Sequence, residues 1–321
     1  MGRGDVDALV IGAGVSGLTT AICLAERGVR TRIWSARMPS DTTSAAAGAM
    51  WGPYLVEPFD RVAVWSQRTL ATLRKLAESP ETGVRLVAGV EASRTPTPPP
   101  DWGGQLEGFR LCQPGELPDG FATGWRFIAP LVDMPTYLGY LLQRARAAGV
   151  DVELRTVRSL DEASDAAPVV VNCAGIGARD LVPDPSLAPI RGQLVVVENP
   201  GITEFFSEDT GLSPELTHFY PFGDTVVLGG LAEEGAWSME PDPAVAAGIL
   251  KRCAEVEPRL RDASAIGHRV GLRPTRPEVR VEAERLGALH VIHNYGHGGA
   301  GVTLSWGCAT EAADLVVASL G

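Results

Sequence analysis

The stretch VDALVIGAGVSG, residues 6–17, constrains the fold of this chain more than any other. Its first half is a short apolar run, typical of a strand buried on both faces of a parallel sheet, and a glycine-rich turn follows directly. In that turn Gly12 permits a tight bend, Gly14 lets a pyrophosphate approach the backbone, and Gly17 lets the next helix pack on the strand. Free N–H groups at the helix start then face the phosphates. The stretch predicts a dinucleotide-binding βα unit.

The segments after this turn favour the same interpretation. An amphipathic run at residues 18–27 is closed by Gly28 as a helix cap, and a second apolar strand follows at residues 29–34. A dinucleotide site usually has an acidic residue next, for the ribose, but the chain has Ser35, Ala36 and Arg37. Arg37 fits a 2′-phosphate, hence NADP, or the adenosine part of another dinucleotide, or a solvated surface. These alternatives stay open at this point.

Composition limits the class of protein. A chain of 321 residues with 45% hydrophobic and 21% charged residues is long enough for two globular domains. The net charge of −11 argues against nucleic-acid and anionic-membrane partners, which bind clustered cations. Five cysteines without CxxC spacing indicate reduced thiols and no structural metal, and no apolar run is long enough to predict a signal peptide or membrane span. We therefore expect a cytoplasmic location.

The segment TTSAAAGAMWGPY, residues 42–54, consists of small and hydroxyl residues followed by an aromatic pair. A flat cofactor can lie against the backbone of such a segment, and a tightly packed helix start explains the pattern equally well. A helix is expected at residues 58–79. Prolines then interrupt residues 80–125, which predicts strands and loops of a second domain.

The chain then returns to its first domain. Asp133 is expected to cap a helix at residues 135–148, because a carboxylate can accept hydrogen bonds from the first helical N–H groups. The strand at residues 169–171 runs into the small-residue loop at residues 172–177. This pattern predicts that a further strand of the main sheet ends at the cofactor site.

A hairpin is expected further on, with strands at residues 216–220 and 225–228 joined through residues 221–224. Alternation along the first strand places His218 and Tyr220 on one face. Arg273 follows in the segment GLRPTRP, where prolines stiffen the backbone that carries the guanidinium. Such an arginine suits bidentate binding of a carboxylate.

The last unit combines a strand at residues 288–293, a glycine-rich loop at residues 294–301 and a helix at residues 302–315. This loop predicts a second anion site at a helix N-terminus. Two such loops suit FAD, which has phosphates at one end and a redox ring at the other. His290, His293 and His297 lie here without carboxylate or cysteine partners in the pattern, so we expect no metal site.

These motifs, taken together with VVVNCAGIGARDL, RGQ, VVLGG and HNYGHGGAGVTLSWG, resemble the D-amino-acid oxidases among FAD-dependent amine oxidoreductases over residues 8–315. The resemblance implies an α/β fold, with a Rossmann-like FAD-binding domain and a discontinuous α+β substrate domain built on an antiparallel sheet. The implied FAD-binding domain comprises residues 1–54, 135–189 and 277–321. The substrate domain comprises residues 55–134 and 190–276.

The resemblance also implies roles for single residues. Arg273 would bind the substrate carboxylate, and Tyr54 and Gly299 would also line the substrate site. FAD would be bound without a covalent link, since the flavin-lining segment lacks His and Cys. The positions expected to contact FAD are Gly12, Ala13, Gly14, Val15, Ser16, Gly17, Arg37, Thr42, Thr43, Ser44, Gly48, Ala49, Met50, Val157, Ala174, Arg273, Gly298, Gly299, Ala300, Gly301, Val302 and Thr303.

In such an enzyme the substrate Cα–H faces flavin N5, a hydride is transferred, and O2 reoxidises the flavin to give H2O2. The imine product hydrolyses to a 2-oxo acid and ammonia, so catalysis is mostly orientation. The family usually has a tyrosine three residues before the hairpin proline, and here that position is His218. Either His218 or Tyr220 can fill its role as a catalytic donor to the substrate carboxylate.

Two alternatives remain: a related amine oxidase or dehydrogenase acting on a secondary amine or biosynthetic intermediate, and an NADP-binding reductase or sensor without flavin chemistry. A monomer and a homodimer are both compatible with the chain. The segments SED at residues 207–209 and AEE at residues 232–234 are acidic. The resemblance implies that family members that oxidise D-aspartate have arginines in these segments. We therefore expect neutral substrate side chains, with basic ones as a second class.

Overall fold

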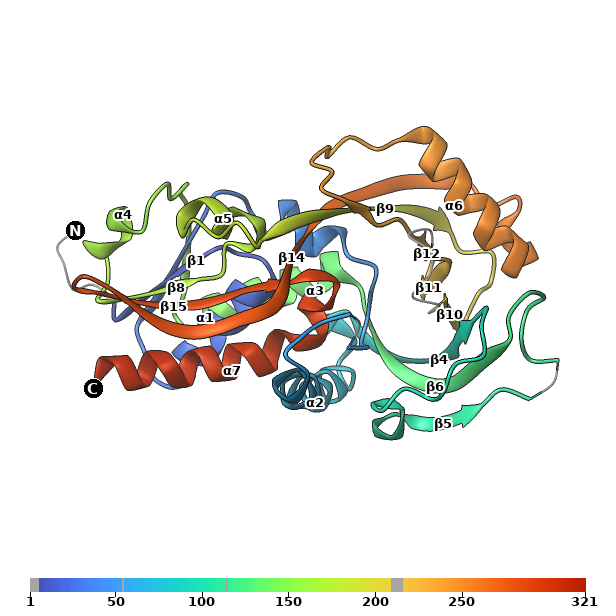
Figure 1. Cartoon of the computed structure of the whole chain (residues 1–321), viewed down its shortest axis with the longest axis horizontal. Coiled ribbons are helices and arrows are strands. Elements are labelled where there is room, and N and C mark those ends of the chain that lie inside the picture. The colour runs from blue at the N-terminus through green and yellow to red at the C-terminus, as the bar shows by residue number, and fades with distance from the viewer. Residues whose placement is uncertain (1–5, 54, 114, 209–215) are drawn as a thin grey trace.

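The computed structural model describes residues 6–53, 55–113, 115–208 and 216–321. Within this part of the chain a single 15-stranded sheet runs through both halves of the molecule. One half, on the left of Figure 1, contains the first described strand, β1, and the C-terminus, and the other half is rich in antiparallel strands. No helix among these residues is long and apolar enough to cross a membrane.

One end of the sheet is parallel, in the order β15-β8-β1-β2-β7. These strands are β1 (Ala8–Ile11), β2 (Thr31–Ser35), β7 (Asp151–Leu154), β8 (Val169–Asn172) and β15 (Leu289–His297). The helices of this half are α1 (Val15–Ala25), α3 (Met134–Ala147), α4 (Asp161–Ser164), α5 (Ala178–Leu181) and α7 (Gly301–Leu320). Ala8 and Val10 pack in the core formed with α1 and α7, while Leu9 and Ile11 pack on the opposite face. Burial on both faces confirms the prediction from the continuous apolar run.

The other end of the sheet is mostly antiparallel, in the order β3-β6-β4-β10-β11-β12-β9-β14. Its strands are β3 (Ala49–Met50), β4 (Val84–Ser93), β5 (Glu107–Leu111), β6 (Thr123–Val132), β9 (Ala188–Glu198), β10 (Phe205–Glu208), β11 (His218–Phe222), β12 (Thr225–Gly229), β13 (Glu233–Glu234) and β14 (Ala265–Leu286). Helix α6 (Pro243–Val256) packs on β9 and β12 through a separate apolar core, and α2 (Phe59–Leu76) packs on α7. A β-carbon at Gly307 of α7 would lie 2.3 Å from the backbone of Trp65, which explains how closely these two helices approach.

Strands β9 and β14 connect the two halves, as Figure 1 shows. The domain boundaries expected at residues 189/190 and 276/277 fall inside these strands, so the chain crosses without a linker. We propose that the two halves correspond to the FAD-binding and substrate domains. Arg273 pairs with Ile190 at the crossing, which fixes its backbone in the sheet between the halves.

Several local predictions were wrong. The hairpin turn contains only Gly223 and Asp224, because Pro221 and Phe222 pair with β12 inside strand β11. The expected loop at residues 294–301 is strand up to His297, since β15 continues to pair with β14, and a 3-10 turn, Gly298–Ala300, joins it to α7. Asp133 precedes α3 but accepts a hydrogen bond from the Thr136 hydroxyl instead of a helix N–H.

Candidate active site

A cavity of about 1490 Å³ lies between the halves, lined by β1, the segment after β2, β14 and the turn before α7. Binding sites for drug-sized ligands have about 300–1,000 Å³, so this cavity suits a larger ligand or two ligands side by side. Its wall includes most of the residues that the sequence predicts as site residues. Most of the cavity surface is apolar, and a smaller number of polar groups face into it, as is typical of a small-molecule site.

The glycine turn after β1 is built for close contact. Gly12 has φ 108, and a β-carbon there would lie 2.4 Å from the Cys173 carbonyl oxygen. A β-carbon at Gly17 would lie 1.9 Å from the Gly12 carbonyl oxygen. Both positions therefore require glycine: Gly12 for the turn and Gly17 for packing of α1 on the strand. Gly14, Val15 and Ser16 at the start of α1 line the cavity, so the positive end of the helix dipole lies beside it, as an anion site requires.

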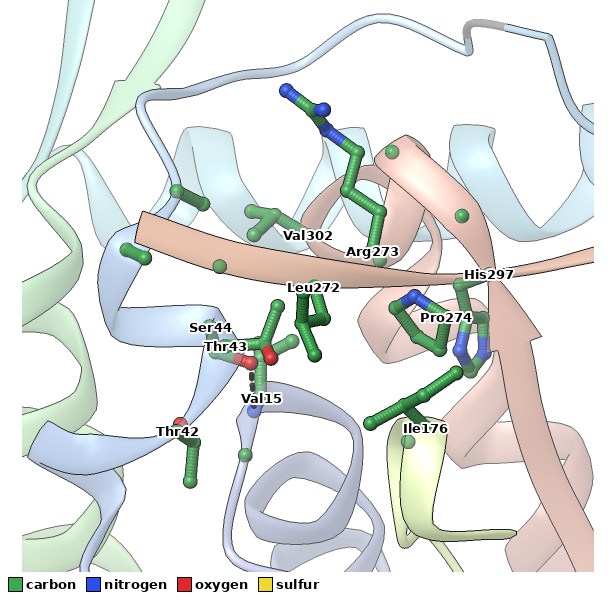
Figure 2. A pocket seen from close by; sticks show the side chains of 18 of the residues that line it. Val15, Thr42, Thr43, Ser44, Ile176, Leu272, Arg273, Pro274, His297 and Val302 are labelled. Carbon is green, nitrogen blue, oxygen red and sulfur yellow. Dashed lines mark hydrogen bonds between the residues drawn. The ribbon is translucent and has the colours of Figure 1, made fainter. Parts of the chain in front are cut away.

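Two serine hydroxyls hold this turn in place. The Ser44 Oγ accepts a hydrogen bond from the Val15 N–H at 3.0 Å, which Figure 2 shows as a dashed line. The Ser35 Oγ accepts one from the Ala13 N–H at 3.2 Å. Residues 42–50 therefore lie against the helix start. The sequence did not mark Ser35 as a site residue. Its position at the end of β2, where dinucleotide sites usually have a carboxylate, was the available indication.

Arg37, beyond β2, is exposed and lines the cavity, and so does Val157. The sequence did not single out Arg155, which lies beside them, with its guanidinium carbon 3.7 Å from the centre of the Trp34 ring. Stacking fixes the guanidinium at this wall of the cavity. A planar cation of this kind suits the adenosine end of a dinucleotide.

The second glycine turn forms another part of the cavity wall. Gly298, Gly299, Gly301, Val302 and Thr303 line it. The Thr303 hydroxyl donates to the Gly52 carbonyl at 3.1 Å and accepts from the Gly52 N–H at 3.2 Å. This pair joins the start of α7 to the segment after β3. The positive end of the α7 dipole therefore points at the cavity.

Arg273 projects from β14 on the side opposite to Leu272, away from Val15 and Ser44 (Figure 2). It is half-buried, and its NH1 donates to the Leu231 carbonyl at 2.9 Å. A β-carbon at Gly192 would lie 2.7 Å from the guanidinium, so glycine in the RGQ motif leaves room for it. A guanidinium presents five N–H donors in a planar fork, the geometry that suits bidentate binding of a carboxylate.

His218 and Tyr220 share the face of β11 that lines the cavity, as alternation along the strand predicts. Their rings stack with centroids 4.8 Å apart and an interplanar angle of 20°. The Tyr220 hydroxyl lies 3.3 Å from the Ser207 Oγ. Both rings therefore face the compartment into which Arg273 points, and both lie within the cavity wall.

Burial, together with the nearby guanidinium groups of Arg273 and Arg252, lowers the pKa of His218 to about 3. The imidazole is therefore neutral at physiological pH and cannot neutralise a substrate carboxylate by charge. It can still donate one hydrogen bond from its single N–H.

This pKa predicts a pH dependence of stability. The unfolded chain protonates His218 near its ordinary pKa of about 6.5, whereas the folded protein does not, so the stabilisation is complete above that pH and decreases as pH falls. Between pH 7 and pH 5 we expect wild type to lose about 1–2 kcal/mol more unfolding free energy than His218→Asn. Urea unfolding of both proteins at the two pH values measures the difference. Equal losses would contradict the lowered pKa.

Most predicted site residues share this one cavity. Those in its wall are Gly12, Ala13, Gly14, Val15, Ser16, Arg37, Thr42, Thr43, Ser44, Gly48, Ala49, Met50, Val157, Ala174, His218, Tyr220, Arg273, Gly298, Gly299, Gly301, Val302 and Thr303. Ala300 is an exception, because it is 1% exposed and faces the core instead of the cavity. Gly17 also lies outside the wall and serves packing, while Tyr54 falls outside the described residues.

One histidine of the last unit, His293, does have a carboxylate partner, contrary to the sequence pattern. His293 Nε2 lies 2.9 Å from Glu284 Oε2, because strand β14 pairs with β15 and brings Glu284 alongside. His297 bonds to the Asn294 side chain, and burial lowers its pKa to about 4. Among the described residues, no group of three or more metal-ligating side chains is placed to hold an ion.

Two of the acidic residues expected to select substrates are neutralised by arginines. Glu208 accepts from Arg94 at 2.7 Å, and Glu233 accepts from Arg191 at 2.7 Å. Glu234 lines the cavity, and Asp209 lies outside the described residues. Repulsion of an acidic substrate by Glu208 and Glu233 is therefore weaker than their sequence positions indicate.

Comparison with known proteins agrees with this geometry. The chain is 53% identical to a D-amino-acid oxidase of Rubrobacter xylanophilus over 99% of its length and 98% of the relative, and 48% identical to one of Streptomyces coelicolor over 97% of each. A glycine oxidase from Geobacillus kaustophilus has a similar fold, with a TM-score of 0.82 and 21% identity over 98% of this chain and 95% of that one. The model of the FAD dependent oxidoreductase family matches residues 7–315. The chain belongs to this family of FAD-dependent oxidoreductases, and its dinucleotide is FAD, not NADP.

Proposed function

We propose that this enzyme is a D-amino-acid oxidase that converts D-amino acids with neutral or basic side chains and O2 to 2-oxo acids, ammonia and H2O2. The observation that carries the proposal is Arg273, a half-buried arginine in the cavity wall. It projects away from Val15 and lies beside the second glycine turn, where a β-carbon at Gly299 would lie 3.8 Å from its Cδ. The two relatives of highest identity given above are named D-amino-acid oxidases, which supports the same substrate class.

The bound FAD supplies a hydride acceptor at its flavin ring. The chain's own residues then bind and orient the substrate. Arg273 binds the carboxylate in a fork, and the neutral His218 or the Tyr220 hydroxyl adds a hydrogen bond from β11. A substrate held by its carboxylate presents its Cα–H in one direction. Such orientation can supply a large part of the decrease in activation free energy. None of these residues needs to remove a proton from the reacting carbon.

The flavin is proposed to be bound without a covalent link. Cys173 and His297 line the cavity, but burial raises the pKa of the Cys173 thiol to about 12 and the His297 Nε2 bonds to Asn294. Neither is therefore a ready nucleophile. We expect the purified protein to be yellow and to release all its FAD into the supernatant after acid precipitation. Yellow colour that stays with the precipitate would contradict this expectation.

The proposed substrate class is tested by an H2O2-release screen over D-amino acids, L-amino acids and secondary amines. We expect release with D-alanine, D-valine and D-lysine, and weaker release with D-aspartate. A response confined to L-amino acids or secondary amines would favour the amine oxidase alternative. If the flavin is reduced by D-amino acids without H2O2, the enzyme is a dehydrogenase with another electron acceptor.

We propose the cytoplasm as the location, because all five cysteines are free thiols, as a reducing compartment maintains them. We also propose a homodimer as the assembly. Light scattering coupled to size-exclusion chromatography distinguishes it from a monomer, whose mass would be 33.9 kDa.

A further inference from the structure

Glu91 is a buried carboxylate in the wall of the same cavity, and no sequence motif marks it. It lies in the interior of β4, is 5% exposed, and lines the cavity together with Ser207, His218 and Tyr220. Carboxylates in strand interiors are seldom buried, because removing the charge from water is costly. A position of this kind is therefore a candidate for a role in the site.

Strand register shows where Glu91 points. Glu91 is in register with Ser207 on the neighbouring strand β10, and Ser207 is in register with His218 on β11. Residues paired in this way point to the same face of a sheet. The Ser207 Oγ lies 3.3 Å from the Tyr220 hydroxyl, and the His218 ring stacks on Tyr220, so this is the face that lines the cavity. Glu91, Ser207 and His218 form one row.

The row relates Glu91 to the proposed carboxylate site. The Arg273 NH1 donates to the Leu231 carbonyl, and a β-carbon at the adjacent Gly230 would lie 2.8 Å from the His218 ring. His218 therefore marks the end of the row near Arg273. Adjacent strands are about 4.8 Å apart, which places the Glu91 backbone roughly 10 Å from that of His218. A substrate with its carboxylate at Arg273 and a long side chain directed along the row would extend toward Glu91.

Three other acidic residues near the cavity, Glu208, Glu233 and Glu234, occupy different places in the fold. Glu208 follows Ser207 by one residue, is in register with Ala92, and its carboxylate bonds to Arg94. Its side chain therefore belongs to the opposite face of the sheet, although the residue contributes to the cavity wall. Glu233 bonds to Arg191 on β9. Glu234 is exposed on β13. Among the described residues of β4, β10 and β11, Glu91 is the acidic residue whose strand register directs it to the side-chain end of the proposed substrate site.

We infer that Glu91 determines substrate specificity: it favours D-amino acids with a cationic group at the end of a long side chain and disfavours acidic side chains. The inference rests on the proposed function and adds the residue that selects the side chain. A substrate ammonium or guanidinium near Glu91 would bring opposite charges together where water screens them little, and a substrate carboxylate would bring like charges together.

The test compares the kcat/KM values of two substrates within one enzyme, because their ratio does not depend on the fraction of active protein. D-lysine is measured against D-norleucine, a neutral side chain of similar length, and D-glutamate against D-methionine. The enzymes are wild type, Glu91→Gln and a charge-matched control, Glu107→Gln, since Glu107 is exposed on β5 and lies outside the cavity.

We expect Glu91→Gln to lower the D-lysine to D-norleucine ratio of kcat/KM by about tenfold or more and to raise the D-glutamate to D-methionine ratio, with both ratios unchanged in Glu107→Gln. Wild type should also oxidise D-lysine with a higher kcat/KM than D-glutamate. This expectation does not depend on whether a variant folds. Ratios within about twofold of wild type in Glu91→Gln, or a wild type that prefers D-glutamate, would overturn the role of Glu91 alone. An enzyme inactive toward every D-amino acid would overturn the proposed function as well.

Discussion

Arg273→Ala should keep its FAD and lose most of its activity toward D-amino acids. Removing one partner of a desolvated charge pair costs about 3–5 kcal/mol, which corresponds to a decrease in kcat/KM of roughly one hundred- to several thousandfold. We expect FAD to be retained because Arg273 projects away from Val15, which belongs to the glycine turn proposed to bind the phosphates. Flavin absorbance and steady-state kinetics measure the two expectations separately.

Two further variants make this result specific. Arg273→Lys keeps the charge but loses the planar fork, so it should recover only part of the activity. Arg285→Ala removes an exposed arginine from the same strand and should behave as wild type. Activity of Arg273→Ala within a few fold of wild type would show that the substrate carboxylate binds elsewhere.

Gly12→Ala should abolish or strongly weaken FAD binding. The β-carbon would lie 2.4 Å from the Cys173 carbonyl oxygen, on a residue with φ 108, so β1 or β8 must move. Strain of this kind costs about 1–3 kcal/mol before any clash, and each 1.4 kcal/mol is a factor of about ten in affinity. We therefore expect FAD to bind at least about tenfold more weakly, measured by titration of the apoprotein with FAD.

The matched control is Gly139→Ala. Gly139 is exposed on α3, and a β-carbon there meets nothing within 4 Å. Alanine should stabilise the helix by up to about 1 kcal/mol and leave FAD binding unchanged. Equal FAD affinity of Gly12→Ala and Gly139→Ala would contradict the account of the glycine turn.

Much of the nucleotide end could be predicted because its determinants are local. The positive φ of Gly12 and the contact of Gly17 with the Gly12 carbonyl both arise in a turn that spans a few residues. Alternation alone placed His218 beside Tyr220. These patterns depend on backbone geometry that neighbouring residues impose on one another.

The residues that sequence reasoning missed depend on contacts between distant segments. Ser35 is recognisable only when Ala13 lies against it, and Glu91 only when β10 and β11 continue the sheet from β4. The partner of His293 was missed for the same reason, because Glu284 comes from the neighbouring strand. The extent of β15 depended on pairing with β14, which no local propensity indicates.

The central claim, that the cavity orients a D-amino acid toward FAD, is tested most directly by anaerobic mixing. Without O2, the flavin can be reoxidised by nothing in the solution, so bleaching of its visible absorbance reports reduction by the substrate alone. We expect D-alanine and D-lysine to bleach the wild-type flavin and the L-enantiomers to leave it oxidised. Bleaching by L-amino acids or secondary amines instead of D-amino acids would contradict the claim.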